Sequence, residues 1–149
     1  MPLLSEHVRE QLRERFEERL RDSVQLRLFV RPDSGRLILP SGMGCATCED
    51  TRQLMTEVVE VAPDVLDLEV LDVSSGSDGV EEVPTLQVSA AGAQARISFR
   101  GLPGGFEFAA LVDAIERVST EDPGLSPETL ERLAMVQDPV EVMVFATPT

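Results

Sequence analysis

Cys45-Ala46-Thr47-Cys48 stands between two segments of different periodicity. Over residues 24–30, polar and apolar side chains alternate before a short apolar run, which predicts a strand. Over residues 47–62, the apolar side chains fall on one face of a helix, and Pro63 ends it. The two cysteines therefore lie at the start of a predicted helix that follows a predicted strand.

This position gives the two thiols different chemical roles. The start of a helix has unpartnered amide N–H groups and the positive end of the helix dipole, and both stabilise a thiolate at Cys45. Because a thiolate is the species that attacks a disulfide, Cys45 is the predicted nucleophile. Cys48 lies about one helical turn further on and is the predicted resolving thiol. Glu49 and Asp50 oppose the thiolate, since they place negative charge beside the pair.

Other interpretations of the cysteine pair stay open. The spacing is short enough to arise by chance, and two buried cysteines would then have only a structural role. A closed zinc site needs two further ligands, and the chain offers one histidine, His7, and no second cysteine pair. Zinc could still bind if each chain of a dimer supplied two thiolates. The strand–loop–helix context favours a redox pair.

The rest of the chain completes an α/β pattern. The predicted elements are a helix over 5–21 with Ser5 as its N-cap, strands over 24–30 and 65–72 on either side of the helix over 47–62, strands over 83–88 and 94–100, and a helix over 106–118. A helix between two strands implies a parallel pair, and the last two strands form an antiparallel hairpin. We therefore expect a mixed four-stranded sheet with helices on both faces, and a long connection over 31–44.

Pro84 lies at the start of the strand predicted over 83–88. Proline cannot donate to a sheet ladder, so it is either a trans residue that begins the strand or a cis residue that holds the backbone beside the cysteines. In the second case, the backbone groups of Val83 could pair with an extended peptide substrate as an added strand.

The end of the chain repeats its beginning. Residues 138–148 align with residues 22–32, with four identical positions in eleven and the same alternation of apolar side chains. Both copies follow a predicted helix, which covers 126–137 in the second copy. We therefore predict one domain over 1–122, and over 123–149 a linker and the helix and strand that begin a second unit. The strand over 140–146 should pair with a sheet edge in this chain or in a neighbour, which would allow oligomers, or be poorly ordered.

Composition limits the classes of partner. A net charge of −14 argues against nucleic acids and anionic membranes, because their phosphates would be repelled. No apolar stretch approaches the length of a membrane span. The N-terminus turns polar at once and lacks the apolar region of a secretory signal, so we expect a cytoplasmic protein.

Five stretches together resemble the thioredoxin/glutaredoxin superfamily, and more narrowly the N-terminal thioredoxin-like unit of glutaredoxin-like protein disulfide oxidoreductases, which carry two fused units. The stretches are residues 22–30, the cysteine pair at 45–48, Val83-Pro84-Thr85, residues 100–108 and residues 144–149. The stretch that begins Gly101-Leu102-Pro103-Gly104 is much more specific than the cysteine spacing.

The resemblance implies a thioredoxin-like fold and a thiol–disulfide oxidoreductase that acts on protein disulfides in cell redox homeostasis. Cys45 and Cys48 would be the redox pair, Pro84 a cis proline facing them, and Val83, Ala46 and Thr47 substrate contacts. The redox-active disulfide would serve in place of a bound cofactor or metal, and a thioredoxin-reductase-like protein or a small thiol would be the reductant. A second Cys-x-x-Cys would follow Thr149. The alternative is a thioredoxin-like module that relays electrons within a larger reductase or only docks a partner.

Overall fold

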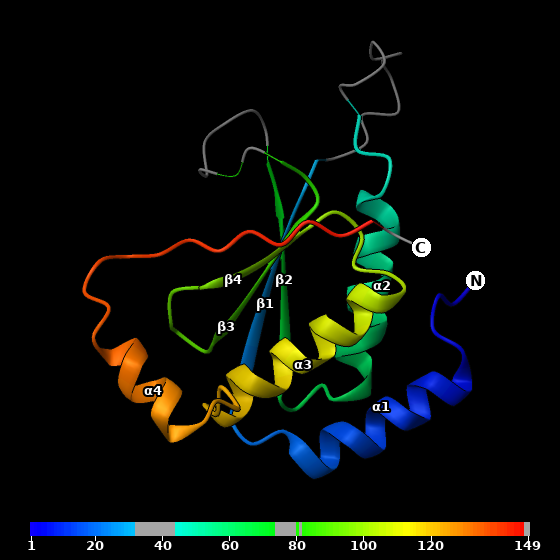
Figure 1. Cartoon of the computed structure of the whole chain (residues 1–149). Helices are drawn as coiled ribbons and strands as arrows, with labels where there is room; N and C mark the ends of the chain where they lie inside the picture. Colours follow the sequence, from blue (N-terminus) through cyan, green and yellow to red (C-terminus); the bar gives the residue numbers. More distant parts are fainter. Residues whose placement is uncertain (32–43, 74–79, 81, 148–149) are drawn as a thin grey trace.

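The computed structural model describes residues 1–31, 44–73, 80 and 82–147, so most of the connection predicted over 31–44 lies outside the described residues. Figure 1 shows the chain with its elements labelled. The elements in chain order are α1 (Glu6–Arg19), β1 (Val24–Val30), α2 (Cys48–Val61), β2 (Leu66–Asp72), β3 (Thr85–Ala90), β4 (Ile97–Arg100), α3 (Phe106–Thr120) and α4 (Pro127–Ala134).

The four strands form one mixed sheet in the order β2-β1-β3-β4, which confirms the predicted sheet. β1 runs parallel to β2, with Val24 opposite Leu66, because α2 carries the chain back to the starting edge. β1 runs antiparallel to β3, and β3 runs antiparallel to β4, to which a hairpin joins it.

The core lies between one face of this sheet and three helices. Alternate residues of β1 point to this face, since successive side chains of a strand alternate between faces. α2 and α3 pack on the sheet, and α1 contributes Leu12 and Phe16 beside them. Each fully buried apolar side chain contributes roughly 1.5–3 kcal/mol. These side chains include Val24, Leu26, Leu28 and Val30 of β1, Leu86 of β3, Met55 and Val58 of α2, and Leu111 and Ile115 of α3.

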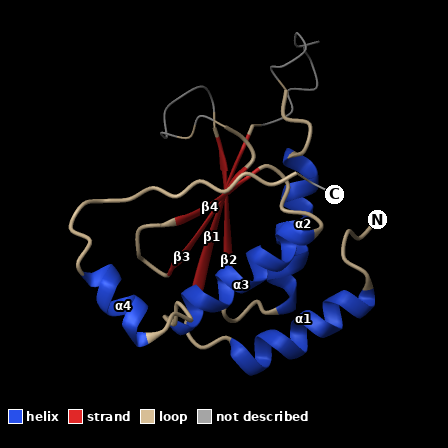
Figure 2. Ribbon diagram, in the orientation of Figure 1, coloured by secondary structure: helices blue, strands red, loops and turns tan. Residues whose placement is uncertain are grey.

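The opposite face of the sheet is mostly polar, with Phe29 buried on it, and the prediction of helices on both faces is wrong for the described part of the chain (Figure 2). Gln25 donates to Asp67 at 2.9 Å across the parallel pair. Two residues further along both strands, Arg27 pairs with Glu69 at 3.0 Å. These polar side chains pair with one another at the exposed β1–β2 part of this face.

Glu57 ties the N-terminal segment to α2. Its carboxylate accepts the backbone N–H of Leu3 at 2.9 Å and that of Leu4 at 2.8 Å, and it pairs with Arg9 at 3.1 Å. Burial by itself raises the pKa of Glu57, but the hydrogen bonds from Leu4, Leu3, Gln53 and Arg9 together lower it to about 2. The segment before α1 is thus fixed to the helix that begins at Cys48.

α4 confirms the predicted helix over 126–137 in a shorter form. The Ser126 hydroxyl accepts the Thr129 N–H at 3.2 Å and caps its start, and Pro127 occupies the first turn. No residue of α4 is buried, so it adds nothing to the core.

Residues 140–146 form no strand in this chain, so the strand predicted there, as the start of a second unit, stays a prediction. A strand exists through hydrogen bonds to a partner strand, and the described part of the chain offers this segment none. Its apolar side chains therefore stay in solvent, and Phe145 is 91% exposed. The predicted second unit remains a prediction.

Among the described helices, none is both long and apolar enough to cross a membrane.

Candidate redox-active site

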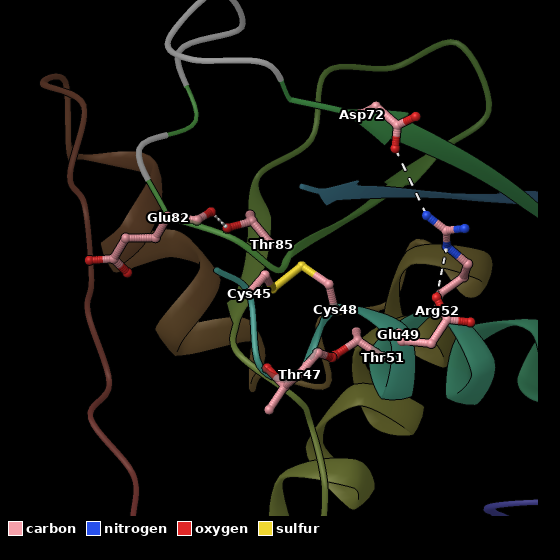
Figure 3. Close-up of a disulfide and its surroundings, with 9 residues drawn as sticks. All are labelled: Cys45, Thr47, Cys48, Glu49, Thr51, Arg52, Asp72, Glu82 and Thr85. Atoms are coloured by element: carbon pink, nitrogen blue, oxygen red, sulfur yellow. Dashed lines mark hydrogen bonds and ion pairs between the residues drawn. A yellow bond between two sulfur atoms is a disulfide. The ribbon is translucent and has the colours of Figure 1, made fainter. Parts of the chain in front are cut away.

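The cysteine pair lies at the start of α2, within a residue of where the sequence predicts the helix. Cys45 and Cys48 form a disulfide with an S–S distance of 1.99 Å and a Cα–Cα distance of 5.5 Å (Figure 3). Thr47 occupies the N-cap position, and its carbonyl accepts both the N–H and the hydroxyl of Thr51, at 2.9 Å and 2.7 Å. These bonds fix the turn that carries the disulfide.

The two sulfur-bearing residues differ in exposure. Cys45 is half-buried, whereas Cys48 is only 6% exposed and belongs to the apolar core. An external disulfide can therefore approach Cys45 more readily than Cys48, and the roles of nucleophile and resolving thiol stay predictions. In the described part of the chain, no group of three or more His, Cys, Asp or Glu side chains could hold a metal ion.

The Val83–Pro84 peptide bond is cis, as the resemblance implied. Hydrogen bonds hold this bond on both sides: the Thr85 hydroxyl donates to the Glu82 carbonyl at 2.6 Å, and Gly101 N–H donates to the Pro84 carbonyl at 2.9 Å. Figure 3 shows the strand start that carries Glu82 and Thr85 beside Cys45. Pro84 is buried, whereas Val83 is only half-buried and accessible from outside.

A cavity of about 400 Å³ lies against the cis proline and against Gly44, the residue before Cys45. The described residues that line it are Arg31, Gly44, Glu82, Val83, Pro84, Arg100 and Gly101. Of the predicted substrate contacts, Val83 and Pro84 line this cavity. Ala46 is exposed and Thr47 half-buried on the turn between the cysteines, and neither lines it.

Arg52 is a charged neighbour that the sequence analysis missed. Its guanidinium lies 4.0 Å from the carboxylate of Glu49 and 3.8 Å from that of Asp72 (Figure 3). One of the two carboxylates that oppose a thiolate is thus partly neutralised. The spacing of three between Glu49 and Arg52 on a helix signals that contact. Nothing in the sequence signals the contact with Asp72, which depends on how β2 packs against α2.

Arg31, Glu82 and Arg100 are likewise absent from the predicted site. The signal for Arg100 is indirect: in the predicted hairpin it lies opposite Thr85, the residue after the cis proline. Arg31 directly follows β1, but the sequence does not show that the end of β1 approaches the cis proline.

Three solved structures are similar to this chain. A protein disulfide oxidoreductase from Aeropyrum pernix K1 matches with a TM-score of 0.69 and 35% identity over 88% of this chain. The alkylhydroperoxide reductase AhpF from Enterococcus faecalis V583 matches with a TM-score of 0.72 and 21% identity over 90% of this chain. A structure of the N-terminal domain of AhpF from the same organism gives a TM-score of 0.70 and 20% identity over 87% of this chain.

The chain covers 54%, 61% and 59% of those three chains, respectively. No protein-family model and no curated protein matches it. The two Enterococcus structures, at 21% and 20% identity, support the fold alone. The Aeropyrum structure is similar in fold and is also 35% identical in sequence. The fold of the chain is similar to that of thioredoxin-like proteins, and the chain resembles the glutaredoxin-like protein disulfide oxidoreductases.

Proposed function

We propose that the chain is a thiol–disulfide oxidoreductase that exchanges the Cys45–Cys48 dithiol or disulfide with protein disulfides. The observation that carries the proposal is a disulfide at a helix start that joins a half-exposed cysteine to a buried one and lies beside a cis proline. The similarity to a protein disulfide oxidoreductase supports the same reaction class.

Reduction of a substrate proceeds in two exchange steps. The Cys45 thiolate attacks one sulfur of the substrate disulfide, forms a mixed disulfide and releases the first substrate thiolate. The Cys48 thiol loses its proton, and its thiolate attacks the Cys45 sulfur, which restores the Cys45–Cys48 disulfide and releases the second substrate thiolate. Two electrons pass from the dithiol to the substrate, and solvent supplies protons to the released thiolates.

Each neighbouring group supports one of these steps. The first-turn N–H groups of α2 have no partner within the helix and stabilise the Cys45 thiolate. The backbone of Val83 pairs with an extended substrate peptide and holds its disulfide near Cys45. Ala46 and Thr47 form the turn over which that peptide passes.

The proposal requires no cofactor beyond the cysteine pair itself. A small thiol or a thioredoxin-reductase-like protein regenerates the dithiol by the reverse exchange. Such a cycle fits a reducing compartment such as the cytoplasm, where surface disulfides are transient.

Reduction of insulin by dithiothreitol tests the proposal. Wild-type protein should accelerate the reaction, and Cys45→Ser should abolish the acceleration because it removes the attacking sulfur. Ser5→Ala is the matched control, since Ser5 caps α1 and does not touch the disulfide. Equal rates for wild type and Cys45→Ser would contradict an enzymatic role of this chain.

A relay module of a larger reductase is the second candidate. It is favoured by the similarity of the fold to AhpF, a subunit of an alkylhydroperoxide reductase. A relay would cycle between dithiol and disulfide with a partner reductase but leave insulin unreduced. Redox titration of the cysteine pair together with the insulin assay distinguishes the two functions.

A further inference from the structure

The first turn of α2 has N–H groups for which two kinds of anion compete. Residues 48–50 begin the helix, and their N–H groups have no partner within it. The side chain of Thr47, the N-cap residue, accepts none of them. These groups stabilise a Cys45 thiolate, but they also attract the carboxylates of Glu49 and Asp50, which lie in the same turn. A carboxylate that turns toward the helix start therefore opposes the thiolate.

Arg52 draws the carboxylate of Glu49 away from the helix start. It lies three residues further along α2, at a spacing that makes the two side chains neighbours. Its Nε lies 4.0 Å from the Glu49 carboxylate, and this Nε is buried and has no hydrogen-bond partner. Because a buried N–H without a partner is unfavourable, it attracts the carboxylate beside it. Figure 3 shows both side chains beyond Cys48, on the side away from Cys45.

Asp72 holds Arg52 in this place. It is the last residue of β2, and the next residue, Val73, donates its N–H to the Val30 carbonyl at 2.7 Å, which fixes the end of the strand. The Asp72 carboxylate lies 3.8 Å from the Arg52 guanidinium. The Glu49 side chain, by contrast, is 82% exposed, so without Arg52 its carboxylate could move around the helix start. Arg52 thus ties a loose carboxylate to a fixed point of the sheet.

We propose, as an extension of the proposed function, that Arg52 is a positioning residue for the exchange reaction, which holds the Glu49 carboxylate away from the first turn of α2 and so favours the Cys45 thiolate. It takes no part in bond making, so the chemistry is the two-step exchange described above. Arg52 acts on the first step, because it raises the fraction of Cys45 that is present as thiolate. A guanidinium stays charged throughout the pH range in which a thiol titrates, so the effect persists across that range.

Other charged groups lie near the cysteine pair, on α2, at the end of β2 and around the cavity. Among the described residues they include Asp50, Asp72, Arg31, Glu82 and Arg100. The variants below leave all of these side chains unchanged. A comparison of each variant with the wild-type sequence therefore isolates the contribution of Arg52 and Glu49.

The titration of Cys45 tests this inference. The chain has two cysteines, so in a Cys48→Ser background the pH dependence of iodoacetamide alkylation, followed by mass spectrometry, reports the pKa of Cys45 alone. Arg52→Gln should raise this pKa by about 0.5 unit, because it releases the Glu49 carboxylate. Below the midpoint, alkylation should then be about twofold slower, and above it slightly faster, since a thiolate of higher pKa is the stronger nucleophile.

A double-variant cycle shows whether Arg52 acts through Glu49. Glu49→Gln should lower the pKa of Cys45 by about 0.3 unit, since it removes one opposing carboxylate. When Glu49→Gln is already present, Arg52→Gln should raise the pKa by less than half as much as it does alone. Arg52→Lys retains the positive charge three residues from Glu49 and should keep the pKa close to the wild-type value.

Arg27→Gln is the matched control. The Arg27 side chain is 43% exposed, against 41% for Arg52, and it also pairs with a carboxylate, that of Glu69 at 3.0 Å. Because Arg27 lies on the mostly polar face of the sheet, its loss should leave the pKa of Cys45 within about 0.1 unit of the wild-type value. Partly exposed ion pairs add little stability, so Arg52→Gln should leave the urea midpoint of unfolding nearly unchanged.

The outcomes separate this inference from the function on which it rests. An unchanged pKa in Arg52→Gln would overturn the inference, as would an equal shift with and without the Glu49 carboxylate. Alkylation slowed by one factor at every pH would also overturn it, because that is a structural effect. If Arg52→Gln does not fold, a Cys45 pKa that fails to drop in Glu49→Gln contradicts the inference instead.

Alkylation uses no disulfide substrate, so its result is independent of the insulin assay. The inference can therefore fail while wild-type protein still reduces insulin. If wild-type protein does not reduce insulin, the proposed function fails, and with it the role of Arg52 in exchange, whatever the alkylation shows.

Discussion

Cys45 and Cys48 share one disulfide but have different surroundings. Cys45 ends a loop and is half-exposed, whereas Cys48 is the first residue of α2 and packs in the core. In the proposed exchange, this asymmetry makes Cys45 the sulfur that an incoming disulfide meets first. It predicts that a mixed disulfide accumulates at Cys45 when Cys48 is absent.

Cys48→Ser should trap the substrate on the protein. The Cys45 thiolate can still attack, but no thiol remains within reach to resolve the mixed disulfide. Mass spectrometry under non-reducing conditions should show one peptide bound per chain, attached at Cys45. The matched Cys45→Ser variant should bind none. Equal trapping by both variants would contradict the predicted order of attack.

Thr85 fixes the chain on both sides of the cis proline. It is buried, and its hydroxyl donates to the Glu82 carbonyl at 2.6 Å. Thr85→Val keeps the side-chain shape but leaves that carbonyl without its donor, so the free energy of unfolding in urea should fall by about 1–2 kcal/mol. Disulfide exchange should slow with it, because Val83 and Pro84 lie between the two bonded residues.

Thr56→Val is the control for this loss. Thr56 also donates its hydroxyl to a carbonyl, that of Arg52 at 2.9 Å, but it is exposed on α2. Water can replace its hydrogen bond, so stability and exchange rate should change little. If both variants lose the same stability, the Thr85 bond has no special role beside Pro84.

α2 connects the redox pair to the N-terminal segment through Glu57. The pKa of this carboxyl is about 2 in the folded chain, against an ordinary value of 4.5. A carboxyl with a lowered pKa contributes stability above its ordinary pKa, and that contribution is lost as pH falls through its folded pKa. Its share of the free energy of unfolding should therefore decline between about pH 4.5 and about pH 2.

Glu57→Gln should show this dependence. At pH 7 the variant should lose about 2 kcal/mol of unfolding free energy, since the amide no longer carries the charge that Arg9 and the two N–H groups bind. The gap to wild type should narrow as pH is lowered from 5 toward 3 in urea titrations. Glu60→Gln, an exposed partner of Arg9, should cost less than about 1 kcal/mol. A gap that stays constant with pH would contradict the assigned role of Glu57.

Elements set by local periodicity could be predicted from the sequence, and those that need a distant partner could not. The alternation over 24–30 gave β1 at its observed bounds, and the apolar face after the cysteines gave α2 within a residue at each end. The same alternation over 140–146 forms no strand in this chain, because alternation records a tendency to pair and not the presence of a partner. Contacts such as Arg52 with Asp72 and Arg100 with Glu82 join elements whose packing no local pattern contains.

At the scale of the whole molecule, the chain divides into a packed part and an unpacked one. Every buried residue of the described chain lies before residue 120, and every described residue after it is exposed. The packed part contains the disulfide, the cis proline and the cavity. It therefore holds both the core that stabilises the fold and all the groups assigned to the reaction.

A chain that ends at Asp122 should fold and react like the full chain. α4 and the segment after it bury no residue, so their removal should change the free energy of unfolding by less than about 0.5 kcal/mol. The rate of insulin reduction should be equally unaffected, since none of the residues described beyond 122 lines the cavity. Removal of exposed apolar side chains such as Val144 and Phe145 should also lower self-association in sedimentation experiments. A large loss of stability on truncation would show that the C-terminal segment packs on the sheet in solution, and would contradict the domain boundary predicted at residue 122.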